Sequence, residues 1–566
     1  MHKHHLLGLR PGVRACLCAL ILLISNQAQA NTEPEAGTAA AEPKPSTPLV
    51  TNIAAAIRNK DASTADHSKF KSLQGPFESG PEVTKACLDC HNEAGHQFTK
   101  TIHWTWEYDD PVTGQKLGKK NLVNTFCTNA RGNEGMCAQC HAGYGWKDDS
   151  FDFTKQENID CLVCHDRTGT YYKTPPTRGN KACSVMFEGL QPIQWAKVAQ
   201  SVGVPGRENC GACHFFGGGG DGVKHGDLDS SLDFPNHDLD VHMDTEGLNF
   251  SCTTCHVSTA HKIAGSRYEM AAHDTKGRGR PGEQRNAASC ESCHGTTPHD
   301  KDELVGIKLN GHVDKIACET CHIPTFARGG VATKVDWDWR TAGKTRNGEG
   351  YQESNYIQGN GEHRHTYRSI KGNFKYGENV KPYYAWFDGT MRYTTIDTRF
   401  DPATAPIEVN GFRGSHDDGV SRIWPFKRMH TVQPYDKGNN TLVYMHLWGD
   451  DKDAYWGNYD FGRAIKVGMA QYDIPYSGEY GFIDTYSYWP ITHMVAPHEQ
   501  ALGCAECHSQ DGRLQSLTGF YMPGRDHFRW LDILGYIALG GALAGVLLHG
   551  LLRKLFGMKN RTRNAS

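Results

Sequence analysis

This 566-residue sequence lacks the features that would place it in several common classes of protein. Its formal net charge is −3 and no basic run occurs before residues 554–566, so no nucleic-acid partner is predicted. The glycine run 217–220 lacks the Gly-Lys-Ser/Thr ending of a phosphate-binding loop. Hydrophobic residues make up 38% of the chain, which is modest for this length. Apart from one five-residue motif, no repeat of fixed period is found.

That motif is Cys-x-x-Cys-His, the attachment signature of c-type haem. Its two thiols form thioethers to one porphyrin, and the adjacent His is placed to ligate the iron. One copy could be half of a zinc site or a redox dithiol, but repeated copies that all end in His exclude both. The eight copies are Cys87-Cys90-His91, Cys137-Cys140-His141, Cys161-Cys164-His165, Cys210-Cys213-His214, Cys252-Cys255-His256, Cys290-Cys293-His294, Cys318-Cys321-His322 and Cys504-Cys507-His508.

Eight covalently attached haem c groups predict a protein that moves electrons. Porphyrins would also supply much of the apolar interior that side chains supply elsewhere, and the glycine run 217–220 would let backbone pass close to one of them. Asp221, Asp227 and Asp229 lie nearby and raise the possibility of bound calcium. Their spacing does not fit an EF-hand, and a solvated acidic loop is the favoured interpretation.

The N-terminal segment predicts export. Residues 1–30 have a basic start, a short apolar run and the small-residue cleavage site Ala28-Gln29-Ala30, as in a secretory signal peptide. Residues 31–64 begin with an Ala, Pro, Glu and Thr-rich stretch and are expected to form a disordered leader. Since bacterial c-type haems are attached outside the cytoplasm, we expect the protein to work in the periplasm.

The C-terminal end predicts a membrane anchor. Residues 531–553 contain an apolar run of about twenty residues, enough to cross ~30 Å of hydrocarbon. The basic tail 554–566 places the C-terminus in the cytoplasm by the positive-inside rule. A buried helix of a soluble domain is the alternative, but Gly535, Gly540, Gly541 and Gly545 favour a membrane helix.

Motif spacing divides the rest of the chain. Seven motifs fall in residues 65–322, too close together for independent cores, and the eighth falls in 504–529. Between them lies 323–503, a haem-free and aromatic-rich lobe in which a run such as 391–396 has strand character. The predicted fold is a mainly α multihaem cytochrome with much irregular structure, some β structure in 323–503 and a single C-terminal transmembrane helix.

Each iron is expected to take a second ligand besides the His of its own motif. Histidines near the motifs are the leading candidates, and those far from them are weaker ones. The leading set is His103, His225, His242, His261, His299, His312, His493 and His498. The weaker set is His67, His237, His363, His365, His416, His430 and His527. Sequence alone cannot show which haem lacks a second strong ligand.

The chain resembles the octahaem tetrathionate reductase family over residues 65–525. The resemblance rests on the unequally spaced motifs with a long gap before the last, on the segment 143–149 (GYGWKDD) and on 215–227 (FFGGGGDGVKHGD). It implies a multihaem fold related to hydroxylamine oxidoreductase and pentahaem nitrite reductase. It also implies that the second haem, on Cys137 and Cys140, is catalytic and carries a lysine ligand in place of a His.

Lys147, six residues after His141, is the position we match to that ligating, catalytic lysine. Its amine would have to be neutral to bind iron, and the alternative is a solvated lysine beside Asp148 and Asp149. Besides Cys16 and Cys18 of the predicted signal peptide, two cysteines lie outside the motifs, Cys127 and Cys183. A disulfide between them suits an oxidising compartment, and a thiol near the catalytic haem is the alternative.

Three functions follow as hypotheses. The leading one is a periplasmic, membrane-anchored reductase that takes electrons from a quinol-linked or cytochrome donor and reduces a small anion at the second haem: tetrathionate, or nitrite or hydroxylamine. The second is an electron conduit whose eight irons all have two ligands. The third is hydroxylamine oxidation, which in its enzyme class needs a tyrosine cross-linked to haem; Tyr480, Tyr486 and Tyr488 are present, but nothing marks one of them for this role.

Overall fold

The computed structural model describes residues 65–124, 128–173, 191–275 and 288–563. The predicted signal peptide and leader, both Cys127 and Cys183, and the last three residues lie outside the described residues. The predicted division of the remainder into lobes is therefore discussed only where contacts bear on it.

The haem motifs lie on short helices. These are α3 (Gly80–Leu88), α6 (Glu134–Cys137) with the 3-10 turn η3 (Ala138–Cys140), α7 (Leu162–His165), α10 (Arg207–His214), α11 (Cys252–Cys255), α12 (Glu291–His294), α14 (Cys318–His322) and α17 (Cys504–Cys507). In five motifs the amide of the motif His donates to the carbonyl of the first Cys, four residues earlier, at 2.8–3.1 Å. One helical turn thus brings both thiols and the imidazole of a motif to one porphyrin.

The second motif is built differently. The amide of His141 donates to Ala138, three residues earlier, at 2.9 Å, and the backbone of His141 is extended, with φ −78° and ψ 131°. The tighter 3-10 turn therefore ends before the motif His, and His141 leaves it in a different direction from a His that continues an α-helical turn.

Residues 333–490 contribute a nine-stranded sheet whose main order is β10-β13-β14-β7-β19-β21-β17. The long strands β19 (Arg422–Asp436) and β21 (Tyr480–Pro490) pair antiparallel from Phe426↔Pro490 to Asp436↔Tyr480. β7 (Thr333–Asp338) runs parallel to β19, and β15 (Tyr383–Phe387) and β20 (Thr441–Leu442) also pair with it. The other members are β10 (Gln352–Glu353), β13 (Tyr367–Arg368), β14 (Gly372–Gly377) and β17 (Ile407–Glu408).

The expectation of a mainly α protein is therefore wrong: helices and strands are mixed. The motif helices are only four to nine residues long because each serves one five-residue motif. The aromatic and β-branched residues of 323–503, by contrast, form paired strands with one buried face. The predicted strand near 391 is present as β16 (Met391–Tyr393), paired with β18 (Asn410–Phe412).

The remaining elements are short, apart from the last helix. The two-stranded pairs are β1 (Tyr108–Asp109) with β2 (Lys116–Leu117), β3 (Val123–Asn124) with β4 (Thr128–Asn129), β5 (Ser258–Thr259) with β6 (Lys262–Ile263), β8 (Thr345–Arg346) with β9 (Glu349–Gly350), and β11 (Tyr356–Ile357) with β12 (His363–Arg364). The other helices are α4 (Ala94–Phe98), α5 (Ile102–Thr105), α9 (Trp195–Gln200), α13 (Leu304–His312), α15 (Tyr455–Asn458), α16 (Phe461–Ala470) and α18 (Arg529–Arg563). The 3-10 turns besides η3 are η1 (His67–Lys69), η2 (Lys71–Leu73), η4 (Gln156–Asn158), η6 (Ser230–Asp233), η7 (Trp339–Thr341), η8 (Pro402–Thr404) and η9 (His498–Gln500).

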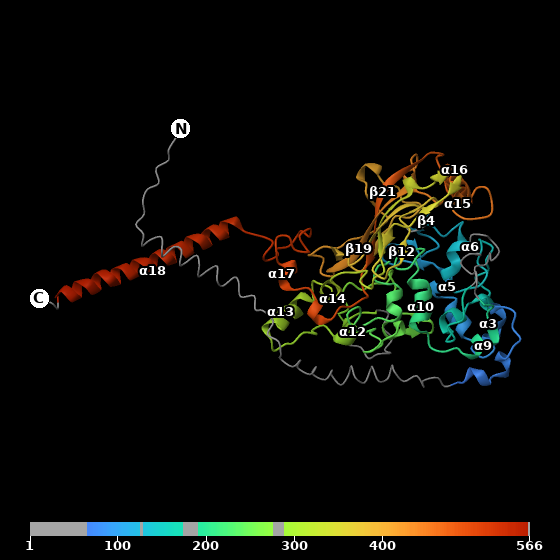
Figure 1. Ribbon diagram of the computed structural model, residues 1–566, viewed down its shortest axis with the longest axis horizontal. Coiled ribbons are helices and arrows are strands. Elements are labelled where there is room, and N and C mark those ends of the chain that lie inside the picture. The colour runs from blue at the N-terminus through green and yellow to red at the C-terminus, as the bar shows by residue number, and fades with distance from the viewer. Residues whose placement is uncertain (1–64, 125–127, 174–190, 276–287, 564–566) are drawn as a thin grey trace. The chain divides into compact units, whose positions relative to one another are not determined.

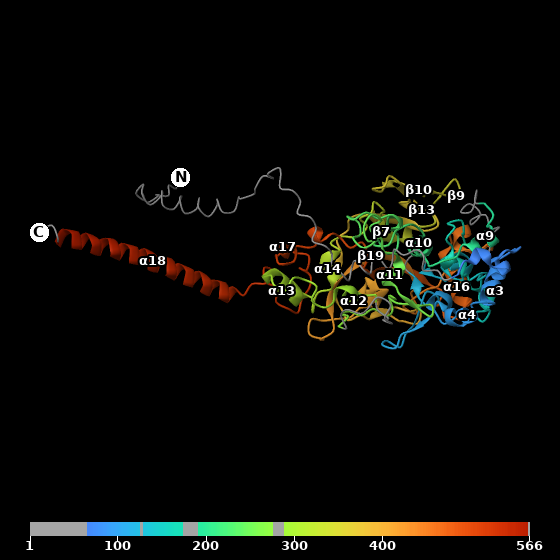
Figure 2. The ribbon, with the colours of Figure 1, turned by 90° about the horizontal axis from the view of Figure 1, so that it is seen from below.

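The sheet lies against the motif helices. Figure 1 shows α10 and α14 along β19, and the view from below shows α11, α12 and α14 in front of it (Figure 2). At this junction the Arg422 guanidinium donates to the Glu291 carboxylate at 2.6 Å, with both side chains buried. A buried charge pair of this kind is stable only while both partners remain, so it fixes α12 against the start of β19.

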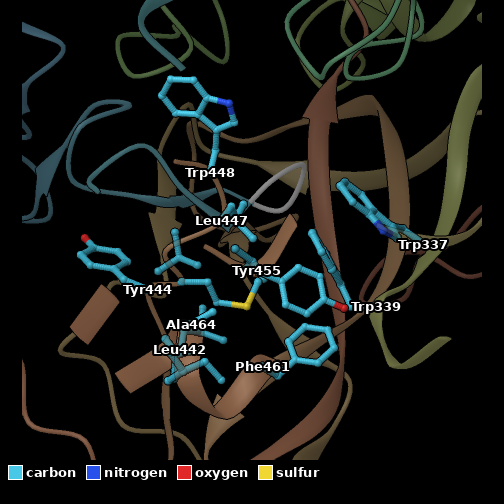
Figure 3. Close-up of a cluster of buried hydrophobic side chains, with 14 of the residues drawn as sticks. Trp337, Trp339, Leu442, Tyr444, Leu447, Trp448, Tyr455, Phe461 and Ala464 are labelled. Carbon is cyan, nitrogen blue, oxygen red and sulfur yellow. The ribbon is translucent and has the colours of Figure 1, made fainter. Parts of the chain in front are cut away.

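Away from the motifs the sheet has a core of its own, drawn in Figure 3. Trp337 and Trp339, both fully buried, stack at 4.9 Å between ring centroids, and Tyr455 and Phe461 pack beside them. This conventional hydrophobic core accounts for a lobe that needs no porphyrin to fill it.

The last helix, α18, is long and apolar enough over Arg529–Met558 to cross a membrane. Its apolar stretch is not buried against the rest of the protein. It contains the predicted segment 531–553. This agrees with the expected anchor.

Candidate functional site

Six of the motif histidines face a second histidine. In each pair the ring centroids lie 5.9–6.4 Å apart. An iron between two imidazoles would form two metal–nitrogen bonds of about 2 Å, and each ring centroid lies about 1 Å beyond its nitrogen. The two centroids would then be about 6 Å apart, as they are in these pairs. The pairs are His67–His91, His103–His214, His242–His294, His256–His493, His299–His322 and His312–His508.

Hydrogen bonds at Nδ1 orient several of these rings. Nδ1 of His165, His256 and His508 each lies 2.8–3.0 Å from a main-chain carbonyl, of Gly203, Ala264 and Pro523 respectively. A hydrogen bond at Nδ1 fixes the tautomer and directs Nε2 toward a metal.

The third motif has a partner of the same kind. His261 hydrogen-bonds Gln97 through Nδ1 at 3.0 Å, and its ring is close enough to His165 to interact electrostatically with it. We match His261 with His165 because His91, the other motif His with which it interacts electrostatically, already faces His67.

The structure separates the predicted second ligands into two groups. His103, His242, His261, His299, His312 and His493 lie beside a motif His, as described above. His225 interacts electrostatically with Lys224, Arg267 and the motif residue His214, which already faces His103. His498 is exposed, its side chain 86% accessible and ion-paired with Glu499. His67, a weaker candidate from the sequence, faces His91. It lies in the short η1 turn, twenty residues before Cys87, and nothing in the sequence marked it as a ligand of that motif.

At the second motif the imidazole is turned away. Nε2 of His141 donates to the main-chain carbonyl of Trp104 at 2.7 Å, so the nitrogen that would bind iron carries a proton and is already used. Burial lowers the pKa of His141 to about 3, and it is therefore neutral. In this arrangement His141 cannot be an axial ligand.

An aromatic cage holds the His141 ring in that position. Its centroid lies 4.7 Å from that of Trp146, 5.3 Å from Trp104 and 5.6 Å from Trp106. Phe151 and Phe153 complete the cage at 5.6 and 6.0 Å. Because the cage encloses a neutral imidazole on several sides, rotating His141 back toward a porphyrin would require repacking.

Two lysines near this motif differ sharply. Lys147, the residue matched from sequence, is exposed, and its charge interacts with the neighbouring Asp148. Lys173 is half-buried as a residue, but its Nζ is buried and has no hydrogen-bond partner within residues 65–124, 128–173, 191–275 and 288–563. Lys173 lies within electrostatic range of Cys140 and of His141. Lys173 therefore has the surroundings that were expected of Lys147.

Comparison with known proteins agrees with the haem motifs. The bacterial cytochrome c family matches residues 334–511, and the cytochrome c554 and c-prime family matches 86–166 and 251–323. An uncharacterized protein of Archaeoglobus fulgidus is 23% identical over 256 residues, which are 38% of this chain and 84% of that protein. The crystal structure of an octahaem cytochrome c from Shewanella oneidensis superposes with a TM-score of 0.67 at 40% identity, over 79% of this chain and 94% of that one. The chain belongs to the octahaem cytochrome c family.

This octahaem cytochrome is thus a multihaem redox protein with covalently bound haem c. Around the second motif it gathers positive charge. Lys119, Lys173 and Lys224 all act electrostatically on Cys140, and Lys224 also interacts with Arg267. Burial lowers the pKa of Lys224 well below its usual range, and the nearby cations lower it further. A bound anion would favour the protonated form of Lys224, so this cluster of half-buried basic side chains is a site suited to a small anion.

Aromatic residues hold the guanidinium of this cluster. Arg267 donates to the hydroxyl of Tyr393 through Nε at 3.1 Å and through one Nη at 2.8 Å. Its guanidinium also lies over the ring of Tyr268, 5.5 Å from the centroid, and Tyr268 stacks on Tyr108. Arg267 is therefore fixed in place while it keeps donors for a further partner.

A buried hydrogen-bond network adjoins Lys173. The hydroxyls of Tyr144 and Tyr171 each donate to the Asp160 carboxylate at 2.8 Å, and Asp160 is almost fully buried. Burial lowers the pKa of Lys173, and the charge of the Asp160 carboxylate partly offsets that fall. The network thus holds the Asp160 carboxylate within electrostatic range of the Lys173 amine.

The three carboxylates considered for calcium each serve another contact. Asp221 accepts from the amide of Ser230 at 2.9 Å, and Asp229 accepts from that of Ser231 at 2.9 Å. Asp227 lies 3.1 Å from Nδ1 of His493 and so orients that ring toward His256. Within the described ranges no group of three or more such side chains is arranged to hold a metal ion.

Asp229 gives a pH dependence of stability. Burial raises its pKa to about 7, so the folded protein holds a proton that the unfolded chain releases near pH 4. The free energy of unfolding should then fall as pH rises from about 4 to 7, by up to about 3 kcal/mol between pH 5 and 8. Asp229→Asn is expected to remove most of this fall in denaturant titrations at the two pH values, and the exposed control Asp417→Asn to leave it. Equal pH dependence in wild type and Asp229→Asn would contradict the assignment.

Contacts also give the order in which the motifs adjoin, numbered along the chain. In α5, His103 faces His214 of motif 4, while the next residue, Trp104, accepts the hydrogen bond from His141 of motif 2. Asn209 of motif 4 donates to Asp166, which follows His165 of motif 3, at 3.0 Å. Motif 4 is therefore the neighbour of both motif 2 and motif 3.

The remaining contacts extend this order in both directions. Thr84, just before motif 1, donates to Ile159 before motif 3 at 2.6 Å. The sulfur atoms of Cys210 and Cys252 lie close together, which places motif 4 beside motif 5. The amide of Phe250, beside motif 5, donates to the carbonyl of His242, which faces motif 6. Sγ of Cys290 in motif 6 lies 3.5 Å from the Glu319 carboxylate in motif 7, and the amide of Leu502, before motif 8, donates to Cys321 of motif 7 at 3.0 Å. The order is 1-3-4-5-6-7-8, with motif 2 as a branch at motif 4.

Proposed function

We propose that this octahaem cytochrome is a membrane-anchored periplasmic reductase that reduces a small anion, tetrathionate in the first place, at the haem on Cys137 and Cys140. One observation carries the proposal: the hydrogen bond from Nε2 of His141 to Trp104, which withdraws the motif His of this haem from its iron. The other motifs have a His–His pair or a His matched to one, as suits haems that only conduct.

Lys173 is the residue proposed to occupy the axial position that His141 leaves. An amine binds a metal only in its neutral form, and burial lowers the pKa of Lys173, which favours that form. Among the described residues its buried Nζ has no hydrogen-bond partner, a costly state for an amine unless something else binds it. The iron of a haem held by Cys137 and Cys140 would supply that partner.

The bound haems would supply the electrons, and the side chains would bind the anion. Reduction of tetrathionate adds two electrons, breaks the central sulfur–sulfur bond and releases two thiosulfates, with no proton required. Arg267 and Lys119 offer positive charge to a dianion and to the charge that develops as the bond breaks, and Lys224 would take up a proton when the dianion binds beside it. Fixed donors of this kind lower the barrier because they need no reorganisation during the reaction.

The proposed location follows from the two ends of the chain. Residues 1–30 would direct export, the eight motifs would receive haem outside the cytoplasm, and α18 would hold the body at the inner membrane. The donor would be quinol-linked or another cytochrome, and the branched order of the motifs would carry its electrons to motif 2 through motif 4.

Film voltammetry of the purified protein tests the reaction and its direction. We expect a reductive catalytic current on addition of tetrathionate, and the same experiment with nitrite and hydroxylamine ranks the acceptors. An electron conduit would give no catalytic current with any of them. An oxidative current with hydroxylamine would support the opposite direction and contradict the proposal.

A further inference from the structure

Helix α13 (Leu304–His312) has an apolar face with no partner among the described residues. Leu304, Val305 and Ile307 are 68%, 60% and 54% exposed, although each is a large aliphatic side chain. Isolated exposed apolar residues are ordinary, but three within four positions of one short helix form a patch.

This helix belongs to the haems at one end of the motif order. His312, its last residue, faces His508 of motif 8. Asn310 accepts from the amide of His299 at 3.0 Å and donates to its carbonyl at 3.0 Å, and His299 faces His322 of motif 7. The apolar patch therefore lies on the element that carries or holds the second histidines of motifs 7 and 8.

The chain itself ties this end of the protein to α18. The carbonyl of Pro523 lies 3.0 Å from Nδ1 of His508, so the segment after motif 8 is fixed to that motif. Helix α18 starts at Arg529, six residues later. Six residues span at most about 20 Å when extended, so the beginning of α18 cannot lie farther than that from Pro523.

Aromatic residues mark the junction. Tyr521 and Phe528 stack at 5.0 Å between ring centroids, and with Trp530 they are 50–63% exposed. Tyrosine and tryptophan collect at the interface of a bilayer, where an apolar ring and a polar tip are both accommodated. The end of the protein that contains motif 8 thus has an interfacial belt next to a membrane-spanning helix.

From these contacts we infer that the apolar face of α13 rests on the lipid surface of the membrane that α18 spans, and that motif 8 is the haem nearest the membrane. The inference rests on the proposed anchoring by α18. It adds that electrons from a donor in the membrane would enter the row of haems at motif 8. Exposed charges of both signs flank the patch, namely Lys301, Asp302, Glu303 and Lys308. Contact is therefore driven by apolar burial and should depend little on anionic lipid.

Hydrogen exchange of the full haem-loaded chain tests the inference. The segment between Cys293 and Cys318 contains no cysteine, so its peptides carry no haem and can be followed. Amides of 303–312 are expected to exchange several-fold more slowly in nanodiscs than in detergent, at any content of anionic lipid, while those of α16 exchange equally in both. The double variant Leu304→Lys/Ile307→Lys should lose this protection, and a control at two other exposed apolar residues, Val112→Lys/Val204→Lys, should keep it.

Equal exchange in nanodisc and detergent, or protection that survives the lysine variant, would overturn the inference. Protection in detergent that grows with protein concentration would also overturn it and would identify a second copy as the occupant. Carbonate extraction and tetrathionate turnover are measured on the same samples. Protein that is inserted and protected but inactive would refute the proposed reaction alone, and active protein without protection would refute this contact alone.

Discussion

Lys173→Gln is expected to lower kcat/KM for tetrathionate by at least about 100-fold, because a group that touches the reacting centre is lost. Glutamine keeps much of the length of the side chain but has no amine to bind iron, and the change breaks no hydrogen bond of Nζ to another described residue. Solution assays with an excess of a low-potential reductant measure the effect, since electron supply is then not limiting. The haem content of the variant should be unchanged.

Lys147→Gln is the matched control. It changes the same residue type in the same part of the chain, but Lys147 is exposed. Its activity should stay within about twofold of wild type, as for most surface substitutions. Loss of activity in Lys147→Gln together with normal activity in Lys173→Gln would reverse the assignment of the lysine.

The second large effect is expected from Arg267→Gln. Removing the guanidinium that Tyr393 and Tyr268 hold in place should raise KM for tetrathionate by about 10- to 100-fold, since a charged hydrogen bond to an anion is worth about 1.5–3 kcal/mol. Steady-state kinetics at increasing ionic strength check it, because screening should weaken the wild type more than the variant.

Arg392→Gln is the control for that change. Arg392 is next to Tyr393 on β16 but is exposed, so the same substitution there removes an equal charge outside the cluster. A rise in KM of similar size in both variants would indicate a general electrostatic effect and contradict a binding role for Arg267.

Much of this arrangement could be predicted from the sequence, since covalent motifs name their own residues. The eight motifs and the apolar C-terminal segment are explicit in the chain. Closeness to a motif in sequence selected six leading histidines that lie near a motif His, but several of them face a motif far along the chain, as His103 faces His214 and His493 faces His256. His67 escaped that reasoning, as it reaches its motif through the fold of η1.

Two features could not be predicted because they depend on three-dimensional packing. The nine-stranded sheet joins strands far apart in the chain, such as β7 with β19, and only their pairing makes the aromatic lobe a sheet. The choice between Lys147 and Lys173 depends on burial of one Nζ atom. Lys173 follows the second motif by more than thirty residues and even comes after the third, so spacing within the motif carried no sign of it.

The most direct test of the account is the number of haems of each ligand type, obtained from near-infrared magnetic circular dichroism of the fully oxidised protein. The account predicts seven haems with two histidines and one haem with an amine ligand, and the amine signal should disappear in Lys173→Gln and persist in Lys147→Gln. Eight haems with two histidines, with His141 bound to the second iron, would contradict it.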